Sequence, residues 1–279
     1  MKTLVRFARA GLVLGVLSFF QPFGYAADID EVRKAAEGGS AQAQNSLGVM
    51  YVKGEDVEQD AKEAVRWFRR AAKQGHVGSQ YNLGLLYFAG SNSDRAKQEA
   101  AKWFQKAAES GHTKAQYRLG MLYIQGGGVE QDYATAAIWL RSAADEDHAE
   151  AQYNLGVLYD NGYGLEQDLT KARGWYLKAA DQAHPGALFN LGTIYFAGRG
   201  TEQDDAEAAH WFRRAAERGH SGAQYNLGAM YLEGRGVAKD DDTGIDWLRQ
   251  AAKQGHVNAQ KIIDQIVPAA NGCPVRASA

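Results

Sequence analysis

The chain has 279 residues, with 31 Lys+Arg against 33 Asp+Glu and a single cysteine. A formal net charge of −2 lacks the concentrated positive charge that nucleic acids and anionic membrane surfaces bind, so we expect neither of them as a partner. One cysteine also excludes an internal disulfide.

Residues 1–26 have the pattern of a secretory signal peptide. The start is basic, with Lys2 and Arg6, and an apolar run follows over residues 10–20. Small residues then precede a cleavage site near Ala26. Because the apolar run is too short for a permanent membrane helix, we expect cleavage, a periplasmic or extracellular protein, and no stable membrane anchor. An uncleaved anchor is the alternative interpretation.

Cleavage would change the charge of the chain. The leader has three basic residues and no acidic one, which leaves 28 Lys+Arg against 33 Asp+Glu and a net charge of −5. This balance favours solubility and mildly favours a basic protein partner.

A period of 36 residues organises the rest of the chain. Glycine recurs at Gly48, Gly84, Gly120, Gly156, Gly192 and Gly228, and tryptophan recurs at Trp67, Trp103, Trp139, Trp175, Trp211 and Trp247. A fixed period of this length is typical of stacked repeat proteins. We therefore divide the chain into an N-terminal capping helix (27–39), six repeats (40–255), a C-terminal capping helix (256–267) and a flexible tail (268–279).

Each repeat is predicted to contain two helices. In the second repeat, Leu83, Leu86 and Tyr87 have the spacing of one helical stripe and predict the first helix. Gly84 lies inside this helix, where glycine costs about 1 kcal/mol relative to alanine. The recurrence of this glycine in every repeat predicts that the second helix approaches closely at this position.

The second helix of the first repeat is predicted over residues 61–74. Asp60 stands at its N-cap, and Glu63 three residues on completes a capping box. The cap recurs at Asp132, Asp168, Asp204 and Asp240, and its partner recurs at Glu207. The second repeat has Ala96 in place of the aspartate, so Asp94 is expected to cap that helix.

The turns between repeats are predicted to contain a glycine in the left-handed conformation. These glycines are Gly75, Gly111, Gly219 and Gly255. Asp147 and Ala183 replace glycine in two repeats, so differently shaped turns are expected there.

The repeat has the pattern Ala-x-x-x-Leu-Gly-x-x-Tyr, then Gly-x-Gly-Val-x-x-Asp, then Ala-x-x-Trp and Ala-Ala. The third repeat matches it at Gly120, Tyr123, Gly126, Gly128, Val129, Asp132, Ala136, Trp139, Ala143 and Ala144. This unit resembles the Sel-1-like repeat, a relative of the tetratricopeptide repeat, over residues 28–267. The resemblance implies an all-α, right-handed α-solenoid of stacked antiparallel helix pairs with a concave groove.

For function, the same resemblance implies a protein-binding role. Secreted bacterial members of the family that this unit resembles include adaptors, host-protein binders and immunity proteins that neutralise toxic effectors. A cysteine-rich branch is associated with β-lactam hydrolysis, but its repeats contain cysteine pairs that this chain lacks.

Six of the seven histidines also follow the period, at His76, His112, His148, His184, His220 and His256. A metal site is one interpretation, because histidine is a common ligand. Packed helices lie about 8–10 Å apart, too far for two zinc bonds of about 2 Å, which favours a residue that begins each first helix. The seventh, His210, is expected to be solvated.

Acidic residues gather in the loops between helices, at Glu130, Asp132, Glu166, Asp168, Glu202, Asp204, Asp205, Asp240, Asp241 and Asp242. They could form calcium sites or a catalytic pair, but helix capping explains the recurrent aspartate and no EF-hand spacing occurs. Nucleophile and phosphate-loop motifs are also absent. We therefore expect no catalytic residues, metal or cofactor. Cys273, in the tail, either bridges to another molecule or has no role.

A second stripe marks the candidate binding surface. Tyr81, Leu85 and Phe88 lie at i, i+4 and i+7 on a first helix, rotated away from the Leu83 stripe. By the tetratricopeptide resemblance, this stripe faces the groove. The candidate partner-binding residues are Tyr81, Leu85, Phe88, Tyr117, Met121, Ile124, Tyr153, Asp160, Phe189, Phe196, Tyr225 and Leu232, with Val157, Thr193 and Ala229 at equivalent middle positions.

The tyrosines of this stripe have an alternative role, which is to pack between neighbouring repeats. Its last position varies but stays mostly apolar, which favours a specific partner. We therefore predict an exported, monomeric scaffold or adaptor that holds a protein partner and has no enzymatic activity. The alternatives are a periplasmic immunity protein that neutralises a lipase or cell-wall-degrading effector, and a β-lactam or cell-wall hydrolase.

Overall fold

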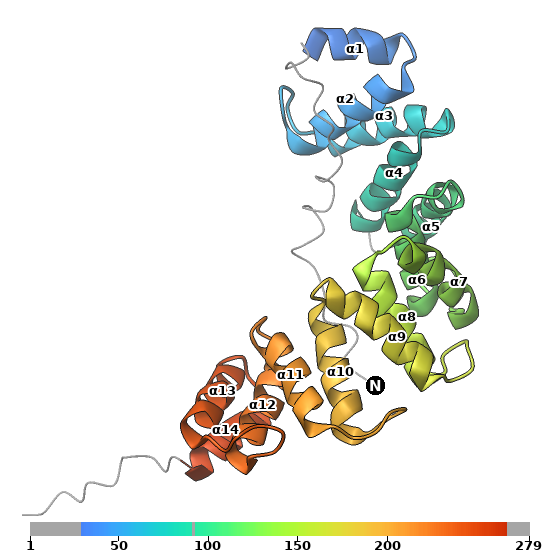
Figure 1. Ribbon diagram of the computed structural model, residues 1–279. Coiled ribbons are helices and arrows are strands. Elements are labelled where there is room, and N and C mark those ends of the chain that lie inside the picture. Colours follow the sequence, from blue (N-terminus) through green and yellow to red (C-terminus); the bar gives the residue numbers. More distant parts are fainter. Residues whose placement is uncertain (1–28, 91–92, 267–279) are drawn as a thin grey trace, which may run out of the picture. The chain divides into compact units, whose positions relative to one another are not determined.

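The computed structural model describes residues 29–90 and 93–266, and all regular structure in these ranges is α-helical (Figure 1). The helices are α1 (Ile29–Glu37), α2 (Ala41–Lys53), α3 (Ala61–Lys73), α4 (Val77–Gly90), α5 (Asp94–Glu109), α6 (Thr113–Gln125), α7 (Tyr133–Asp145), α8 (Ala149–Asn161), α9 (Leu169–Asp181), α10 (Pro185–Ala197), α11 (Asp205–Ala216), α12 (Ser221–Glu233), α13 (Asp241–Lys253) and α14 (Val257–Ile266). The predicted leader (1–26) and tail (268–279, with Cys273) lie outside the described residues.

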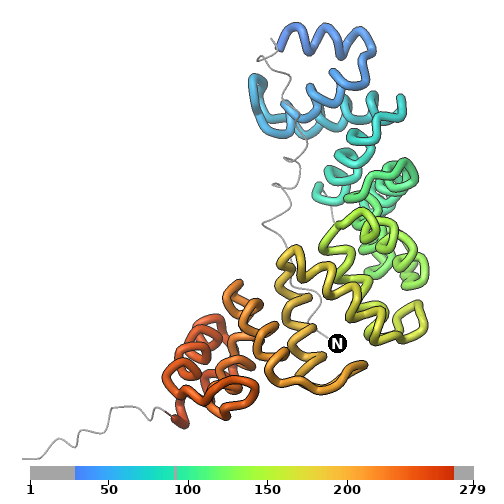
Figure 2. The backbone as a smooth tube through the Cα atoms, viewed as in Figure 1, coloured from blue at the N-terminus to red at the C-terminus, as the bar shows by residue number. Residues whose placement is uncertain are grey.

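The chain divides into two compact units, Met1–Ala143 and Ala144–Ala279. In the first unit, α2 packs against α3 and α4 against α5, and α1 covers α2 (Figure 2). In the second unit, α8 packs against α9, α10 against α11 and α12 against α13, and α14 follows as the last helix. The predicted all-α class, with consecutive helices packed as pairs, is confirmed.

The close approach at the recurrent glycine is also confirmed. A Cβ atom added to Gly84 would lie 2.7 Å from the ring of Phe104, and one added to Gly156 would lie 2.7 Å from the ring of Tyr176. Gly48, Gly120, Gly192 and Gly228 contact Phe68, Leu140, Phe212 and Leu248 in the same way. No side chain fits here, so the glycine lets the second helix bury a large residue against the backbone of the first.

The aspartate caps form as predicted, but the capping box does not. The Asp60 carboxylate accepts hydrogen bonds from the backbone N–H groups of Lys62 (2.7 Å) and Glu63 (3.1 Å). However, the Glu63 side chain pairs with Arg66, and the Asp60 N–H donates to the Tyr51 carbonyl at 3.0 Å. The expectation for Glu63 was wrong because the end of the first helix already satisfies this N–H.

The same correction holds for the fifth repeat, where the Asp204 N–H donates to the Tyr195 carbonyl at 2.9 Å instead of to Glu207. The cap predicted for the second repeat was also wrong. Ser93 is the N-cap of α5, and its hydroxyl accepts from the Ala96 N–H at 3.3 Å. Asp94 becomes the first helical residue because α5 begins a turn earlier than the other second helices.

The turns at Asp147 and Ala183 keep the shape of the glycine turns, contrary to expectation. Their φ angles are 58° and 60°, in the left-handed region that Gly219 occupies at 81°. In both types of turn, the following histidine N–H donates to a carbonyl of the preceding helix, as His184 does to Ala179 at 3.0 Å. The packed helices on both sides therefore impose the backbone conformation, and Ala183 adopts it at a steric cost.

We predict that Ala183→Gly stabilises the protein by about 0.5–1 kcal/mol, because it relieves the left-handed strain of about 1–2 kcal/mol but increases the entropy of the unfolded chain. Urea denaturation measures this change. The matched substitution Gly219→Ala, at the same position of the next repeat, should destabilise the protein by a similar amount. Equal midpoints for Ala183→Gly and the parent protein would contradict the strain at Ala183.

Candidate functional site

The aromatic residues of the predicted stripe lie where the first helices of neighbouring repeats meet. Four of these rings stack on the histidine that begins the next first helix. The pairs are Tyr81–His112, Tyr153–His184, Phe189–His220 and Tyr225–His256, with ring centroids 4.5, 4.4, 4.3 and 4.5 Å apart. These aromatic side chains therefore pack between repeats, which was the alternative left open by the sequence.

The histidines begin the first helices, as the sequence predicted. The His112 Nδ1 accepts a hydrogen bond from the Ala115 N–H at 3.2 Å, and the His220 Nδ1 accepts from the Ala223 N–H at 3.2 Å. The His76 Nδ1 accepts from the Ser79 N–H at 3.1 Å. An accepting Nδ1 carries no proton, so the cap requires the neutral imidazole. Burial lowers the pKa of His76, His112 and His220, which favours the same neutral form.

The first part of the stripe is covered in the second repeat. Tyr81 is 7% exposed and Leu85 is 4% exposed, and both belong to a buried cluster with Phe104 and Leu119. Phe88 is half-buried and packs against the same cluster. In this repeat the stripe therefore contributes to the core along most of its length.

The last position of the stripe contacts the next repeat in the second unit. Asp160 forms an ion pair with Arg199 at 2.6 Å and accepts from the Tyr176 hydroxyl at 3.3 Å. The guanidinium of Arg235 lies 3.9 Å from the centre of the Phe196 ring. The last-position side chain of one repeat thus holds the loop arginine of the following repeat, through charge in one case and a cation–π contact in the other.

The remaining stripe residues are partly exposed: Tyr117, Met121, Ile124, Val157, Thr193, Ala229 and Leu232. They are joined by a line of polar residues that sequence reasoning did not select, at Asn82, Asn154, Asn190 and Asn226, which are all half-buried. Their signal was the asparagine or arginine that directly follows the aromatic residue in the second to sixth repeats. The partly exposed face of the first helices is therefore mixed in character, with apolar and amide side chains side by side.

The acidic loop residues fit capping better than catalysis or metal binding. Hydrogen bonds from Thr135 hold the pKa of Asp132 below its usual value, and the Lys171 N–H does the same for Asp168. A general acid needs a raised pKa, so these carboxylates are poor candidates for that role. Within residues 29–90 and 93–266, no group of three His, Cys, Asp or Glu side chains is placed to hold a metal ion. No helix of that same part is both long and apolar enough to span a membrane.

We predict that the free energy of unfolding falls as the pH drops from about 7.5 to about 5.5. The folded pKa of each of the three buried histidines lies below the unfolded value of about 6.5, so the unfolded state takes up protons first. The loss begins near the unfolded pKa and is complete below the folded pKa. Denaturation midpoints at a series of pH values measure it.

His220→Asn should reduce this pH dependence, because asparagine also caps a helix but does not titrate in this range. The control is His210→Asn, which replaces an exposed histidine of α11 that caps no helix. An unchanged slope in the His220 variant would show that the caps do not couple to pH.

The Sel1 repeat matches the chain six times, over residues 41–76, 77–112, 113–148, 149–184, 185–220 and 221–256. A protective antigen of uropathogenic Escherichia coli with an SLR fold is 36% identical, with a TM-score of 0.81, over 87% of this chain and 53% of the antigen, so this chain spans about half the antigen's length. A Sel1 repeat protein from Oxalobacter formigenes is 31% identical, with a TM-score of 0.58, over 85% of this chain and 79% of that one.

An immunity protein from Pseudomonas aeruginosa is 22% identical over 74% of this chain and 80% of its own, with a TM-score of 0.44, and this likeness carries no argument about function. No curated protein matches the sequence significantly. The six consecutive matches cover most of the chain and coincide with the packed helix pairs. The chain therefore belongs to the Sel1 repeat family.

Proposed function

We propose that this Sel1 repeat protein is an exported, non-enzymatic scaffold that holds a protein partner on the face of its first helices. Sel1 repeats and related solenoids present extended surfaces built from equivalent positions of successive repeats. The antigen and the Oxalobacter protein support the repeat architecture, and the partner is inferred from this chain's own residues.

The observation that carries the proposal is the contrast between two positions on the first helix. The buried leucine is the same in every repeat: Leu47, Leu83, Leu119, Leu155, Leu191 and Leu227. Two residues later the position varies: Val49, Leu85, Met121, Val157, Thr193 and Ala229. Packing of the helix pair requires the constant leucine. The variable position is partly exposed in the last four repeats. Its side chain can therefore differ from repeat to repeat and contact another molecule.

The chemistry of this face fits a protein better than other ligands. Met121 and Val157 offer apolar contact, and the half-buried Asn226 offers an amide donor and acceptor. Such a mixture matches the average protein–protein interface. Nucleic acid would need concentrated positive charge, which this face lacks.

Export rests on the pattern of residues 1–26. The chain, tagged at its C-terminus and expressed in a bacterial host, should accumulate in the cell-envelope fraction and begin near residue 27 by N-terminal sequencing. A protein that keeps residue 1 and stays in the cytoplasm would contradict export. That result would not bear on the proposed binding surface.

Partner binding is tested by affinity capture from cell-envelope extract with quantitative mass spectrometry. The double variant Val157→Glu/Thr193→Glu places two charges on the first-helix face of the second unit and should lose most of the captured partner. Desolvating an unpaired carboxylate in an interface costs several kcal/mol, so a loss of at least about tenfold is expected.

The control is Thr170→Glu/His210→Glu, which adds the same two charges to exposed positions of α9 and α11, on the second helices. This variant should capture the partner as the parent protein does. Equal capture by both double variants, or no protein retained specifically by the parent, would rule out the first-helix face as the binding surface.

A further inference from the structure

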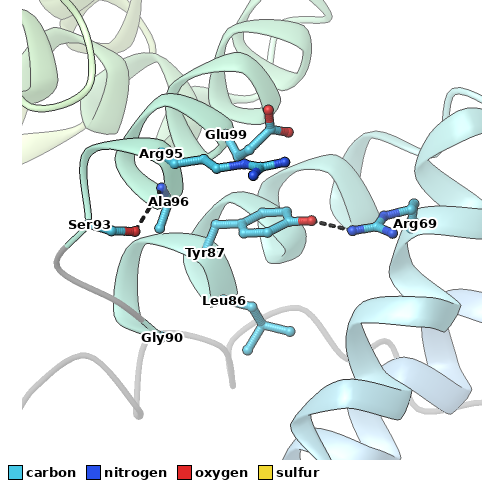
Figure 3. A pocket seen from close by; sticks show the side chains of 8 residues that line it. All are labelled: Arg69, Leu86, Tyr87, Gly90, Ser93, Arg95, Ala96 and Glu99. Atoms are coloured by element: carbon cyan, nitrogen blue, oxygen red, sulfur yellow. Dashed lines mark hydrogen bonds between the residues drawn. The ribbon is translucent and has the colours of Figure 1, made fainter.

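A cavity of about 570 Å³ lies at the corner between α4 and α5 in the first unit (Figure 3). It is lined by Arg69, Leu86, Tyr87, Gly90, Ser93, Arg95, Ala96 and Glu99. Arg69 comes from α3, and its Nη2 donates to the Tyr87 hydroxyl. Arg95 and Glu99 are one turn apart on α5, and Figure 3 shows the Arg95 side chain running alongside Tyr87.

This corner differs from that of the other repeats in the hydrogen bonds made at the start of the second helix. In the other five repeats, the N–H of the capping aspartate donates to the carbonyl of the tyrosine that corresponds to Tyr87, as Asp240 does to Tyr231 at 3.0 Å. In this repeat Ala96 stands at the aspartate position, and its N–H donates to the Ser93 hydroxyl. Helix α5 therefore begins about one turn earlier, at Asp94, than the second helices of the other repeats.

The residue before the cap changes as well. In three repeats it is a glutamine whose side-chain amide donates to a first-helix carbonyl: Gln59 to Val52 at 2.8 Å, Gln131 to Ile124 at 2.6 Å and Gln167 to Asp160 at 2.8 Å. In the second repeat this position is Arg95, whose guanidinium lines the cavity. The second repeat thus has a guanidinium where these three repeats have an amide. The corner of the first repeat also holds a cavity, of about 500 Å³, but four acidic residues line it against the single Arg33: Asp56, Glu58, Asp60 and Glu63.

The cavity carries an excess of positive charge. Among the described residues, neither Arg69 nor Arg95 forms an ion pair, whereas the Glu99 carboxylate is paired with Lys102 at 2.9 Å. Helix α3 adds to the positive field, since it has five basic residues against the single acidic Glu63. The local charge is therefore opposite in sign to the net charge of the chain.

We propose that this cavity binds a carboxylate of an acidic segment of the partner protein, an inference that rests on the proposed scaffold function. The two guanidinium groups can direct several N–H donors at one carboxylate. The nearby Glu99 leaves a net charge of one in the lining, which a single carboxylate neutralises and a doubly charged phosphate would exceed. Leu86 and the Tyr87 ring supply an apolar wall for a neighbouring aliphatic side chain of the same segment.

The test is a fluorescence anisotropy titration of the mature protein with a labelled peptide in which glutamates alternate with leucines. Binding should saturate and weaken with salt, and a peptide with glutamine in place of glutamate should bind at least about tenfold more weakly. Arg69→Gln/Arg95→Gln should lower the affinity for the glutamate peptide by about tenfold or more, since it removes the charge-assisted hydrogen bonds.

Two further variants separate the cavity from effects on folding. Glu99→Gln should raise the affinity by about two- to fivefold, because it removes the one negative charge of the lining, and a misfolded protein would not show this gain. Arg213→Gln should leave the affinity within about twofold, since Arg213 makes the same kind of bond to a tyrosine, Tyr231 at 2.8 Å, in the second unit.

Equal binding of the glutamate and glutamine peptides, no gain with Glu99→Gln, or equal losses with Arg213→Gln would overturn the proposal. So would a preference for inorganic phosphate or for phosphatidylglycerol vesicles over the glutamate peptide. The capture experiment tests the first-helix face, which is a different surface from the cavity. If the peptide titration fails but the parent protein still captures a partner, the cavity proposal alone is removed. If the parent protein retains no partner specifically, the scaffold function is removed.

Discussion

The fold depends on one contact, the close approach of a large second-helix side chain to a glycine in the first helix. At Gly84 and Gly192, an added Cβ would lie 2.7 and 2.5 Å from the rings of Phe104 and Phe212. Any larger residue would push the two helices of the repeat apart. Because the glycine and its partner stand 20 residues apart in every repeat, this contact fixes how each pair of helices is aligned. The cost of glycine within a helix is offset by the burial of an aromatic or leucine side chain.

A second set of contacts shows how far a single repeat can vary within this frame. A buried glutamine of the first helix donates to a carbonyl of the preceding second helix and accepts from a glutamine 30 residues later. The accepting pairs are Gln44–Gln74, Gln152–Gln182 and Gln224–Gln254, at 2.8, 2.9 and 2.8 Å. Ser110 replaces the donor opposite Gln80, whose Oε1 is buried without a partner in the described part of the chain. In the fifth repeat Leu188 replaces the acceptor itself. The helix pair forms in all these cases, so the glycine contact outweighs the loss of one hydrogen bond.

The period alone was enough to predict the helix pairs, the aspartate caps and the reason for the glycines, since these follow from spacing and size. The failures share a cause. Ala183 and Glu63 were judged by local preference, but packed neighbours and an available carbonyl decided their conformation and contacts. For the candidate surface, the sequence identified Tyr81 as a stripe residue. It could not decide whether the Tyr81 ring faces a partner or packs against the next repeat. The cavity beside Arg95 was not predictable, because it depends on which hydrogen bonds fail to form at Ala96.

The same locality of contacts explains why such a cavity can arise at all. In a stacked repeat protein, each repeat contacts only its neighbours, so a change in one connection does not propagate through the stack. Replacing the aspartate cap by Ala96 removes a bond to Tyr87, but Ser93 restores a cap to α5 and the Phe104–Gly84 contact is untouched. The repeat thus keeps its frame while its corner acquires Arg95, next to Arg69 of the preceding repeat. Structural and recognition residues are therefore separable in this fold. A position that departs from the repeat consensus without disturbing the glycine contact is where a binding role should be sought first.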